Sequence, residues 1–350
     1  MTGCSPALRR LFLAYARDEP FALVPPDHEK FLAECRYHGL MGCLADLVER
    51  HGHSSREFAS LCREAFKAEF FKWARYQALQ NQLEEALDRA DLDALLLKGA
   101  ALRMTVYRRP GLRPLSDIDL LVRPEAFDET ARALVGIGLL SSPHGNRFSD
   151  FQGRNVDLHG PELGRVEAGC GLRSQDLWAG SQPVPGSRVW RVLEPRTNLA
   201  HLAVHALKHS YSRLGWLMDI ELVAREAGVR QIEHVAAARA VQSALYVCGE
   251  LVGRRADPPG RFQGRILLGM LARDLHPLGQ MLLAWHQPRW RDRFDFLRES
   301  ASEAPAYETT DSVTSRMVRL SIRLVRLLVE QVLPRGRKSM SRDEARAPDD

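Results

Sequence analysis

The sequence predicts an α+β fold in which a small mixed sheet lies between two helical regions. Two patterns lead to this class. Apolar residues recur every three or four positions towards both ends of the chain, as in amphipathic helices. In the middle, short apolar runs are bounded by Gly, Pro or polar residues, as in strands. We therefore expect an N-terminal helical region over 1–90, a sheet core over 91–195, a C-terminal helical region over 196–333 and a disordered tail over 334–350.

Individual elements follow from these patterns. A long helix is expected over 56–90, because this stretch contains neither Pro nor Gly. In the core, a helix is expected in RPEAFDETARALVGIG, with Pro124 in its first turn and Gly136 or Gly138 at its end. The expected strands are LDALLLKG, DIDLLV, NVDLHG and SRVWRV.

The composition is that of an ordinary globular protein, with 45% hydrophobic and 27% charged residues. No apolar run is long enough to span a membrane, and the N-terminus lacks a signal-peptide pattern. We therefore expect a cytoplasmic protein, whose six cysteines are reduced thiols. A net charge of +5 is too mild to indicate a nucleic-acid partner, and the oligomeric state stays open.

Aspartates interrupt two of the expected strands. Asp117 and Asp119 both point to one face of their strand, about 7 Å apart. At an effective dielectric near 20, two such charges repel by about 2 kcal/mol, so a cation or open water has to compensate them. Asp157 interrupts the later strand NVDLHG. Three carboxylates on neighbouring strands offer the oxygen ligands that Mg²⁺ prefers, although aspartates also simply cap strand ends.

A possible phosphate site precedes these aspartates. Lys98 and Gly99 stand where the strand in LLLKGAAL should turn into a helix. A glycine lets a ligand approach the backbone, and the first amides of a helix suit a phosphate. Taken alone, a glycine at this place is equally typical of an ordinary turn.

The order of these features is similar to that of the polymerase-β-like nucleotidyltransferase superfamily: a glycine turn, a helix, a strand with two aspartates and a later strand aspartate. More closely, LKGAALRMTVYRRPGLRPLSDIDLLV and the later VDLH resemble a bacterial family of uncharacterised nucleotidyltransferases. The resemblance covers about residues 93–160 and implies that the small sheet is a nucleotidyltransferase core.

The resemblance also implies roles for the acidic residues. Asp117 and Asp119 would bind two Mg²⁺ or Mn²⁺ ions, and Asp157 would complete the metal site and serve as general base. One ion would stay with the phosphates of an NTP, while the other would activate an acceptor hydroxyl that attacks the α-phosphate. The acceptor and the identity of the NTP stay open.

One departure from the superfamily concerns phosphate binding. Its usual Gly-Ser turn is Gly99-Ala100 in this chain, and the spacing to the first aspartate is longer. Lys98, Arg113 or Ser116 would then replace the missing hydroxyl. Arg113 suits a triphosphate because guanidinium binds phosphate oxygens in a bidentate manner, but it is equally well explained as a loop arginine in solvent.

Several histidines have more than one interpretation. His159 lies on the same strand face as Asp157 and can support the site by a hydrogen bond. His201, His205 and His209 share one face of an expected helix. A buried or interfacial stripe explains these three better than a transition-metal site, because no Glu or Cys has matching spacing. The stripe can still face the cleft and contact substrate.

Two further groups of charges lie in the C-terminal region. Asp219 interrupts an apolar helix, and we expect it to tie that helix to the core. Four arginines fall within an arc of about 80° on a later helix, which favours a wet edge of a buried helix over a membrane surface: Arg316, Arg319, Arg323 and Arg326.

Two classes of function follow. The first is a metal-dependent enzyme that transfers NMP from an NTP to a hydroxyl of a small molecule, peptide or protein. The second is a non-catalytic nucleotide-binding or scaffold protein with the same fold. A nucleic-acid polymerase is disfavoured, because the chain lacks the basic and aromatic track that a strand would need.

Overall fold

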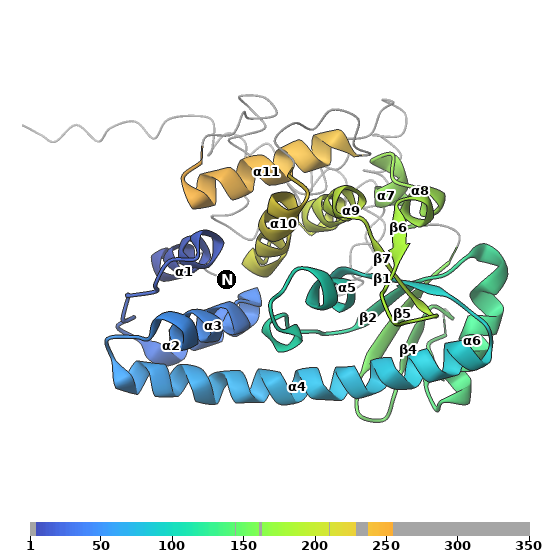
Figure 1. Cartoon of the computed structure of the whole chain (residues 1–350), viewed down its shortest axis with the longest axis horizontal. Coiled ribbons are helices and arrows are strands. Elements are labelled where there is room, and N and C mark those ends of the chain that lie inside the picture. The colour runs from blue at the N-terminus through green and yellow to red at the C-terminus, as the bar shows by residue number, and fades with distance from the viewer. Residues whose placement is uncertain (1–4, 144, 161–162, 210, 229–236, 255–350) are drawn as a thin grey trace, which may run out of the picture. The chain divides into compact units, whose positions relative to one another are not determined.

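The computed structural model describes residues 5–143, 145–160, 163–209, 211–228 and 237–254 (Figure 1). These residues form one mixed sheet with helices on either side, which confirms the predicted α+β class. The arginine stripe over 316–326, the rest of the predicted C-terminal helical region after 254 and the predicted tail over 334–350 lie outside the described residues. Among the described helices, none has the length and apolar character needed to cross a bilayer.

Three of the described helices begin at capping side chains. The hydroxyls of Ser5 and Ser55 and the carboxylate of Asp27 accept backbone N–H groups at three helix starts, which satisfies donors that a helix leaves unpaired. The helices are α1 (Pro6–Arg17), α2 (His28–His38), α3 (Met41–His51), α4 (Arg56–Arg89), α5 (Lys98–Thr105), α6 (Phe127–Gly136), α7 (Arg165–Gly169), α8 (Ser174–Ala179), α9 (Pro195–Lys208), α10 (Leu214–Glu226) and α11 (Ala238–Val252), with the short 3₁₀ turns η1 (Pro110–Leu112) and η2 (Pro124–Ala126).

The described strands form a seven-stranded sheet in the order β3-β4-β5-β2-β1-β7-β6. The two central pairs, β2 with β5 and β1 with β7, are parallel, whereas β1 and β2 are antiparallel. The four strands expected from the sequence form its centre, and the three that it did not indicate are short and lie towards the edges. The strands are β1 (Ala94–Leu97), β2 (Ile118–Leu121), β3 (Leu140–Ser141), β4 (Arg147–Ser149), β5 (Asn155–His159), β6 (Ser181–Pro183) and β7 (Trp190–Leu193).

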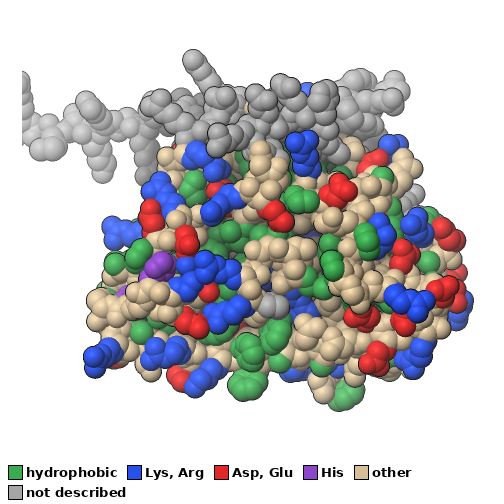
Figure 2. All heavy atoms as spheres, in the orientation of Figure 1, with side chains coloured by type: hydrophobic (Ala, Val, Ile, Leu, Met, Phe, Trp, Pro, Cys, Tyr) green, Lys and Arg blue, Asp and Glu red, His purple; other side chains and the backbone are tan. Residues whose placement is uncertain are grey.

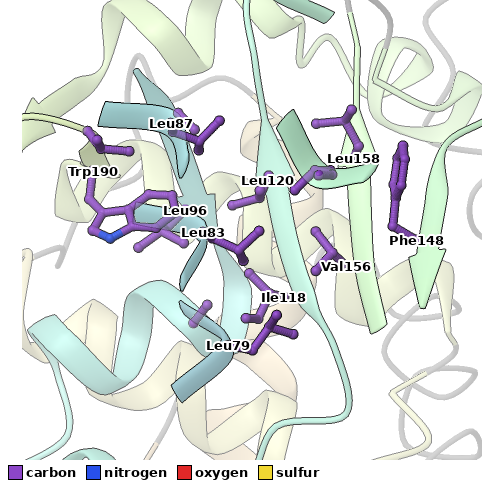
Figure 3. Packing of buried hydrophobic residues seen from close by; sticks show 14 of the residues in the cluster. Leu79, Leu83, Leu87, Leu96, Ile118, Leu120, Phe148, Val156, Leu158 and Trp190 are labelled. Atoms are coloured by element: carbon purple, nitrogen blue, oxygen red, sulfur yellow. The ribbon is translucent and has the colours of Figure 1, made fainter. Parts of the chain in front are cut away.

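Strand alternation gives the sheet one apolar face and one face that carries the charged residues. Helix α4 packs its second half against the apolar face, where its leucines meet alternate residues of the central strands (Figure 3). This cluster includes Leu79, Leu83 and Leu87 from the helix and Leu96, Ile118, Leu120, Val156 and Leu158 from the strands. The residues between these on β2 and β5 therefore point to the opposite face.

The N-terminal and C-terminal helices pack against each other through α1. Helix α1 contacts both α10 and α11. Two arginines link the helices by bonds to backbone carbonyls: Arg17 donates to Val252 at 2.6 Å, and Arg225 donates to Ala16 at 2.6 Å. The predicted N-terminal region is thus joined to the sheet through α4 and to the C-terminal helices through α1.

Helix α3 and the turn η1 approach so closely that a glycine is required between them. A Cβ on Gly42 would lie 2.6 Å from the carbonyl carbon of Leu112. Since this carbonyl group belongs to the backbone, it cannot turn away as a flexible side chain would. The turn η1 leads directly into the segment that carries Asp117, so this contact helps to position the start of β2.

We therefore expect Gly42→Ala to destabilise the fold by about 1–3 kcal/mol, the usual cost of overpacking. Gly136→Ala is the matched control, because Gly136 is also a terminal-turn glycine of a helix, the last residue of α6, but has no neighbour within 4 Å of a Cβ. That substitution should be neutral or stabilise by up to about 1 kcal/mol. Urea unfolding of both variants tests this, and equal stabilities would contradict the close contact.

Candidate active site

The register of two parallel strands brings the predicted carboxylates together. Asp119 on β2 is paired directly with Asp157 on β5, and Leu121 is paired with His159. Asp117 stands one residue before β2, two positions from Asp119, and so faces the same side of the sheet. All three carboxylates line one cleft with a volume of about 1170 Å³, which is large enough for a nucleotide.

Asp119 lies deepest, with 2% of its surface exposed. Its Oδ1 atom lies 2.6 Å from Lys98 Nζ and 2.9 Å from His159 Nε2. Burial acts to raise the pKa of Asp119, but the charge of Lys98 and the hydrogen bond from His159 outweigh it and hold this pKa well below its usual range. Asp119 is therefore a permanently charged carboxylate.

The chain reaches this arrangement through an unusual backbone conformation at Lys98. Lys98 has a φ of +49°, in the left-handed region, at the junction between β1 and α5. Such conformations are costly for residues other than glycine and are concentrated at functional sites. Burial acts to lower the pKa of Lys98, but the charge of Asp119 outweighs it and raises the pKa, so the ammonium stays charged.

Asp117 is less well compensated. The hydroxyl of Ser116 donates to Asp117 Oδ1 at 3.0 Å, and the phenol of Tyr76 donates to the Ser116 carbonyl. Burial, followed by the negative charge of Asp119, raises the pKa of Asp117. A bound cation would relieve this cost, which is the main sign that the site suits one.

Asp157 pairs with Arg147, which no sequence pattern marks as a site residue. Arg147 Nε and Nη2 donate to the two oxygens of Asp157 at 2.7 and 3.1 Å, because the two residues face each other across the β4–β5 hairpin. The glycine turn in DFQGRN, with Gly153 at a φ of +73°, is the one signal that could have indicated this hairpin. The Arg147 side chain is about half exposed, at 54%, and so can move away.

Gly99 admits a neighbouring segment of the chain. A Cβ at this position would lie 2.7 Å from Leu115 Cδ2 and 3.8 Å from Arg113 Cζ. The glycine therefore lets the loop before β2 pack against the first turn of α5. In this way the first amides of α5, Ser116 and Asp117 come to the same end of the cleft.

Arg113 lies in the cleft wall, where its guanidinium is bound to Asp219 of α10. Nε lies 2.9 and 3.0 Å from the two carboxylate oxygens, and Nη2 lies 2.8 Å from Oδ2. Tyr107 donates to the same carboxylate at 2.7 Å. Asp219 thus ties its helix to the core, as expected, and Arg113 is neither a solvated loop residue nor a fully free guanidinium.

The predicted histidine stripe on α9 faces the cleft, and all three of its members line it. His201 is buried, and burial together with the charge of Lys98 lowers its pKa to about 3. His205 packs against His209 and Trp216, with ring centroids 4.8 and 5.1 Å apart. These histidines are therefore part of a packed wall.

The three aspartates fit a hard divalent cation by their chemistry, since they offer carboxylate oxygens on one face. In the described part of the chain, however, no three His, Cys, Asp or Glu side chains are already arranged around a metal position. Arg147 is hydrogen-bonded to both carboxylate oxygens of Asp157, and Lys98 is hydrogen-bonded to one carboxylate oxygen of Asp119. A cation would have to displace Arg147, which its exposure allows.

Other charges of the cleft were not indicated by the sequence. Glu167 of α7 and Lys208 of α9 form an ion pair on the wall opposite the strands, with Nζ and Oε1 3.4 Å apart. On the face that Figure 2 shows, Lys and Arg side chains are interspersed with Asp and Glu side chains. The mild positive charge is therefore not collected into one basic area on that face.

Comparison with known proteins gives one match. A family model described as uncharacterised nucleotidyltransferase matches residues 25–253, a range that includes every described element from α2 onward. No curated protein and no solved structure matches the chain.

The buried pair of Arg113 and Asp219 gives a prediction about stability. Asp219→Asn should destabilise the fold by about 3–5 kcal/mol, because it leaves a buried guanidinium uncompensated. The double variant Arg113→Met with Asp219→Leu should recover much of this loss. Glu49→Gln, which breaks the exposed pair with Arg109, should cost at most about 1 kcal/mol. Urea unfolding measures all three, and a double variant no more stable than Asp219→Asn would show that the unpaired charge of Arg113 is not the cause of the loss.

Asp117 gives a prediction about pH. Because its pKa is raised in the folded state, its ionised form destabilises the fold at pH values above that pKa. In EDTA, Asp117→Asn should therefore melt at a higher temperature than wild type at pH 7. The gain should vanish near pH 3, where the group is protonated in both the folded and unfolded states. A gain of equal size at both pH values would show that the charge is not its cause.

Proposed function

This chain belongs to the family of uncharacterised nucleotidyltransferases, and from that premise we propose that it transfers NMP from an NTP to a hydroxyl group of an acceptor with the help of Mg²⁺ or Mn²⁺. The observation that carries the proposal is the parallel register of β2 and β5, which sets Asp119 beside Asp157 on the same face as Asp117. These carboxylates share a cleft with the partly buried Lys98.

Asp117, Asp119 and Asp157 are the residues that would hold the metal ions. When bound, such ions offset the charge of the phosphates and lower the pKa of an acceptor hydroxyl. Asp119 is suited to this role because it stays ionised across the physiological range. Asp117 is suited because a cation would offset both the burial and the repulsion from Asp119 that raise its pKa.

The triphosphate would lie at the start of α5. Its first amides, the Lys98 ammonium and the Ser116 hydroxyl are all near this end of the cleft, and each can donate to phosphate oxygens. Gly99 would keep the backbone accessible there. Arg113 would contribute its positive charge and, through its bonds to Asp219, hold the loop that carries Ser116.

Asp157 would accept the proton of the acceptor hydroxyl as that oxygen attacks the α-phosphate and pyrophosphate leaves. For this step its carboxylate must be released by Arg147. The freed guanidinium, still at the edge of the cleft, could then bind a phosphate oxygen. The exchange of Arg147 from Asp157 to the nucleotide would thereby couple NTP binding to activation of the base.

One observation favours a second candidate, a nucleotide-binding or scaffold protein without catalysis. Lys98 and Arg147 already provide cations for Asp119 and Asp157, so most of the site's charge is balanced by the protein itself. Such a site could bind a nucleotide and hold it without turnover.

The proposal is tested by treating the carboxylates separately. Asp117→Asn and Asp119→Asn should abolish both the thermal shift given by Mg²⁺ with an NTP and the transfer of label from an α-labelled NTP. Asp157→Asn should retain a substantial part of the thermal shift but lose transfer by about 10²-fold or more, the usual effect of losing a general base. Transfer is measured with cell lysate as the source of acceptors.

Asp128→Asn is the matched control, because Asp128 is an exposed aspartate on α6 outside the cleft. It should behave as wild type in both assays. Equal transfer by wild type and Asp157→Asn would remove the base role from Asp157. A strong thermal shift without transfer to any acceptor would favour the scaffold, and the absence of a shift with all four NTPs would contradict the nucleotide site itself.

A further inference from the structure

The wall of the cleft opposite the strands contains a buried carboxylate that the proposed chemistry does not use. Glu167 has 9% of its surface exposed, and its Oε1 atom receives one long bond from Lys208 at 3.4 Å. Its Oε2 atom has no hydrogen-bond partner among the described residues. A buried carboxylate oxygen without a donor is costly and calls for a ligand.

The chain leaves room for this oxygen. A Cβ on Gly164 would lie 2.7 Å from Glu167 Oε2, so any other residue at that position would press on the carboxylate. Glu167 also lines the same cleft as the three aspartates. Its negative charge is one of the influences that raise the pKa of Lys98, which places Glu167 within electrostatic reach of the catalytic face.

A second unpartnered polar atom lies on the same wall. His201 has 3% of its surface exposed, and its Nδ1 atom has no hydrogen-bond partner among the described residues. Lys98, Asp119 and Lys208 all influence its pKa, which burial lowers to about 3. The imidazole is therefore neutral, and a neutral imidazole offers one donor and one acceptor.

Aromatic rings continue this wall. His205, His209 and Trp216 form a cluster in which each ring centroid lies 4.8–5.1 Å from the others. All three residues line the cleft. Their flat faces can pack against the C–H groups of a ligand.

We propose that this wall, formed by α7, α9 and the start of α10, binds the acceptor, and that the acceptor is a neutral polyol such as a sugar. Glu167 Oε2 would accept a hydrogen bond from one hydroxyl, and His201 Nδ1 would meet a neighbouring hydroxyl. The ring cluster would pack against the carbon skeleton. This inference rests on the proposed function, because it assigns the partner of the same transfer reaction.

The charges of the wall select a neutral ligand. The negative charge of Glu167 is offset by Lys208. A cationic acceptor would therefore be repelled by the Lys208 ammonium, which lies beside the Glu167 carboxylate. An anionic acceptor would be repelled by the Glu167 carboxylate itself. A hydroxyl-rich ligand satisfies Glu167 and His201 without adding charge, and the burial of both residues favours a small molecule over a protein surface.

The test uses the whole chain, Mg²⁺, α-labelled NTPs and a panel of defined probes. The panel contains glucose, N-acetylglucosamine and myo-inositol as neutral polyols, glucosamine as a cation, gluconate as an anion and a serine-containing peptide. We expect labelled product from at least one neutral polyol. Saturation-transfer NMR with the same polyols gives a binding measurement that does not require turnover.

Glu167→Gln should raise the KM for the polyol by about tenfold or more, because the polyol hydroxyl no longer donates its hydrogen bond to a charged carboxylate. The KM for the NTP and the Mg²⁺-dependent thermal shift should not change. Glu167→Asp keeps the negative charge but withdraws the carboxylate by one methylene group, so it should show the same defect if the fold is intact. Glu69→Gln is the matched control, because Glu69 lines the same cleft from α4.

The readouts separate the two proposals. A normal thermal shift in wild type together with transfer only to the cation, the anion or the peptide would overturn this inference alone. An unchanged polyol KM in both Glu167 variants would do the same, as would the absence of any polyol signal in the NMR experiment. No thermal shift in wild type would overturn the proposed function and this inference with it.

Discussion

The site is organised around the buried negative charge of Asp119. A carboxylate that is almost fully removed from water has to be paired with cations or hydrogen-bond donors, and here Lys98 and His159 both bind the same oxygen. Lys98 does so from a left-handed backbone conformation between β1 and α5. The position of α5, the loop packed on Gly99 and the end of β5 all follow from the need to surround this one charge.

The sequence was sufficient to predict the centre of the fold and its carboxylates. The four central strands are short and rich in buried apolar residues, and aspartates in such strands are conspicuous because burial normally excludes them. The long helix α4 was predictable for a similar reason, since nothing within Arg56–Arg89 interrupts its pattern. These are features whose signal lies within one short stretch of chain.

The rest of the site could not be predicted because it depends on partners that are far apart in the sequence. Arg113 and Asp219 are separated by 106 positions, and neither residue carries a local sign of the other. Arg147 reaches Asp157 from a strand of three residues, too short to show a period. Glu167 stands in a helix of five residues, and its burial arises only when α9 packs against it.

Helix α4 has a mechanical consequence for the cleft. Its 34 residues correspond to a rod of about 50 Å at 1.5 Å per residue. One half packs on the N-terminal helices, and the other half packs on the apolar face of the sheet. Because a sharp kink would disrupt the hydrogen bonds of this helix, which contains neither Pro nor Gly, we expect its two halves to move together. Any closure of the cleft around its ligands would then have to come from a movement of the wall formed by α7 and α9, while the sheet and α4 stay in place.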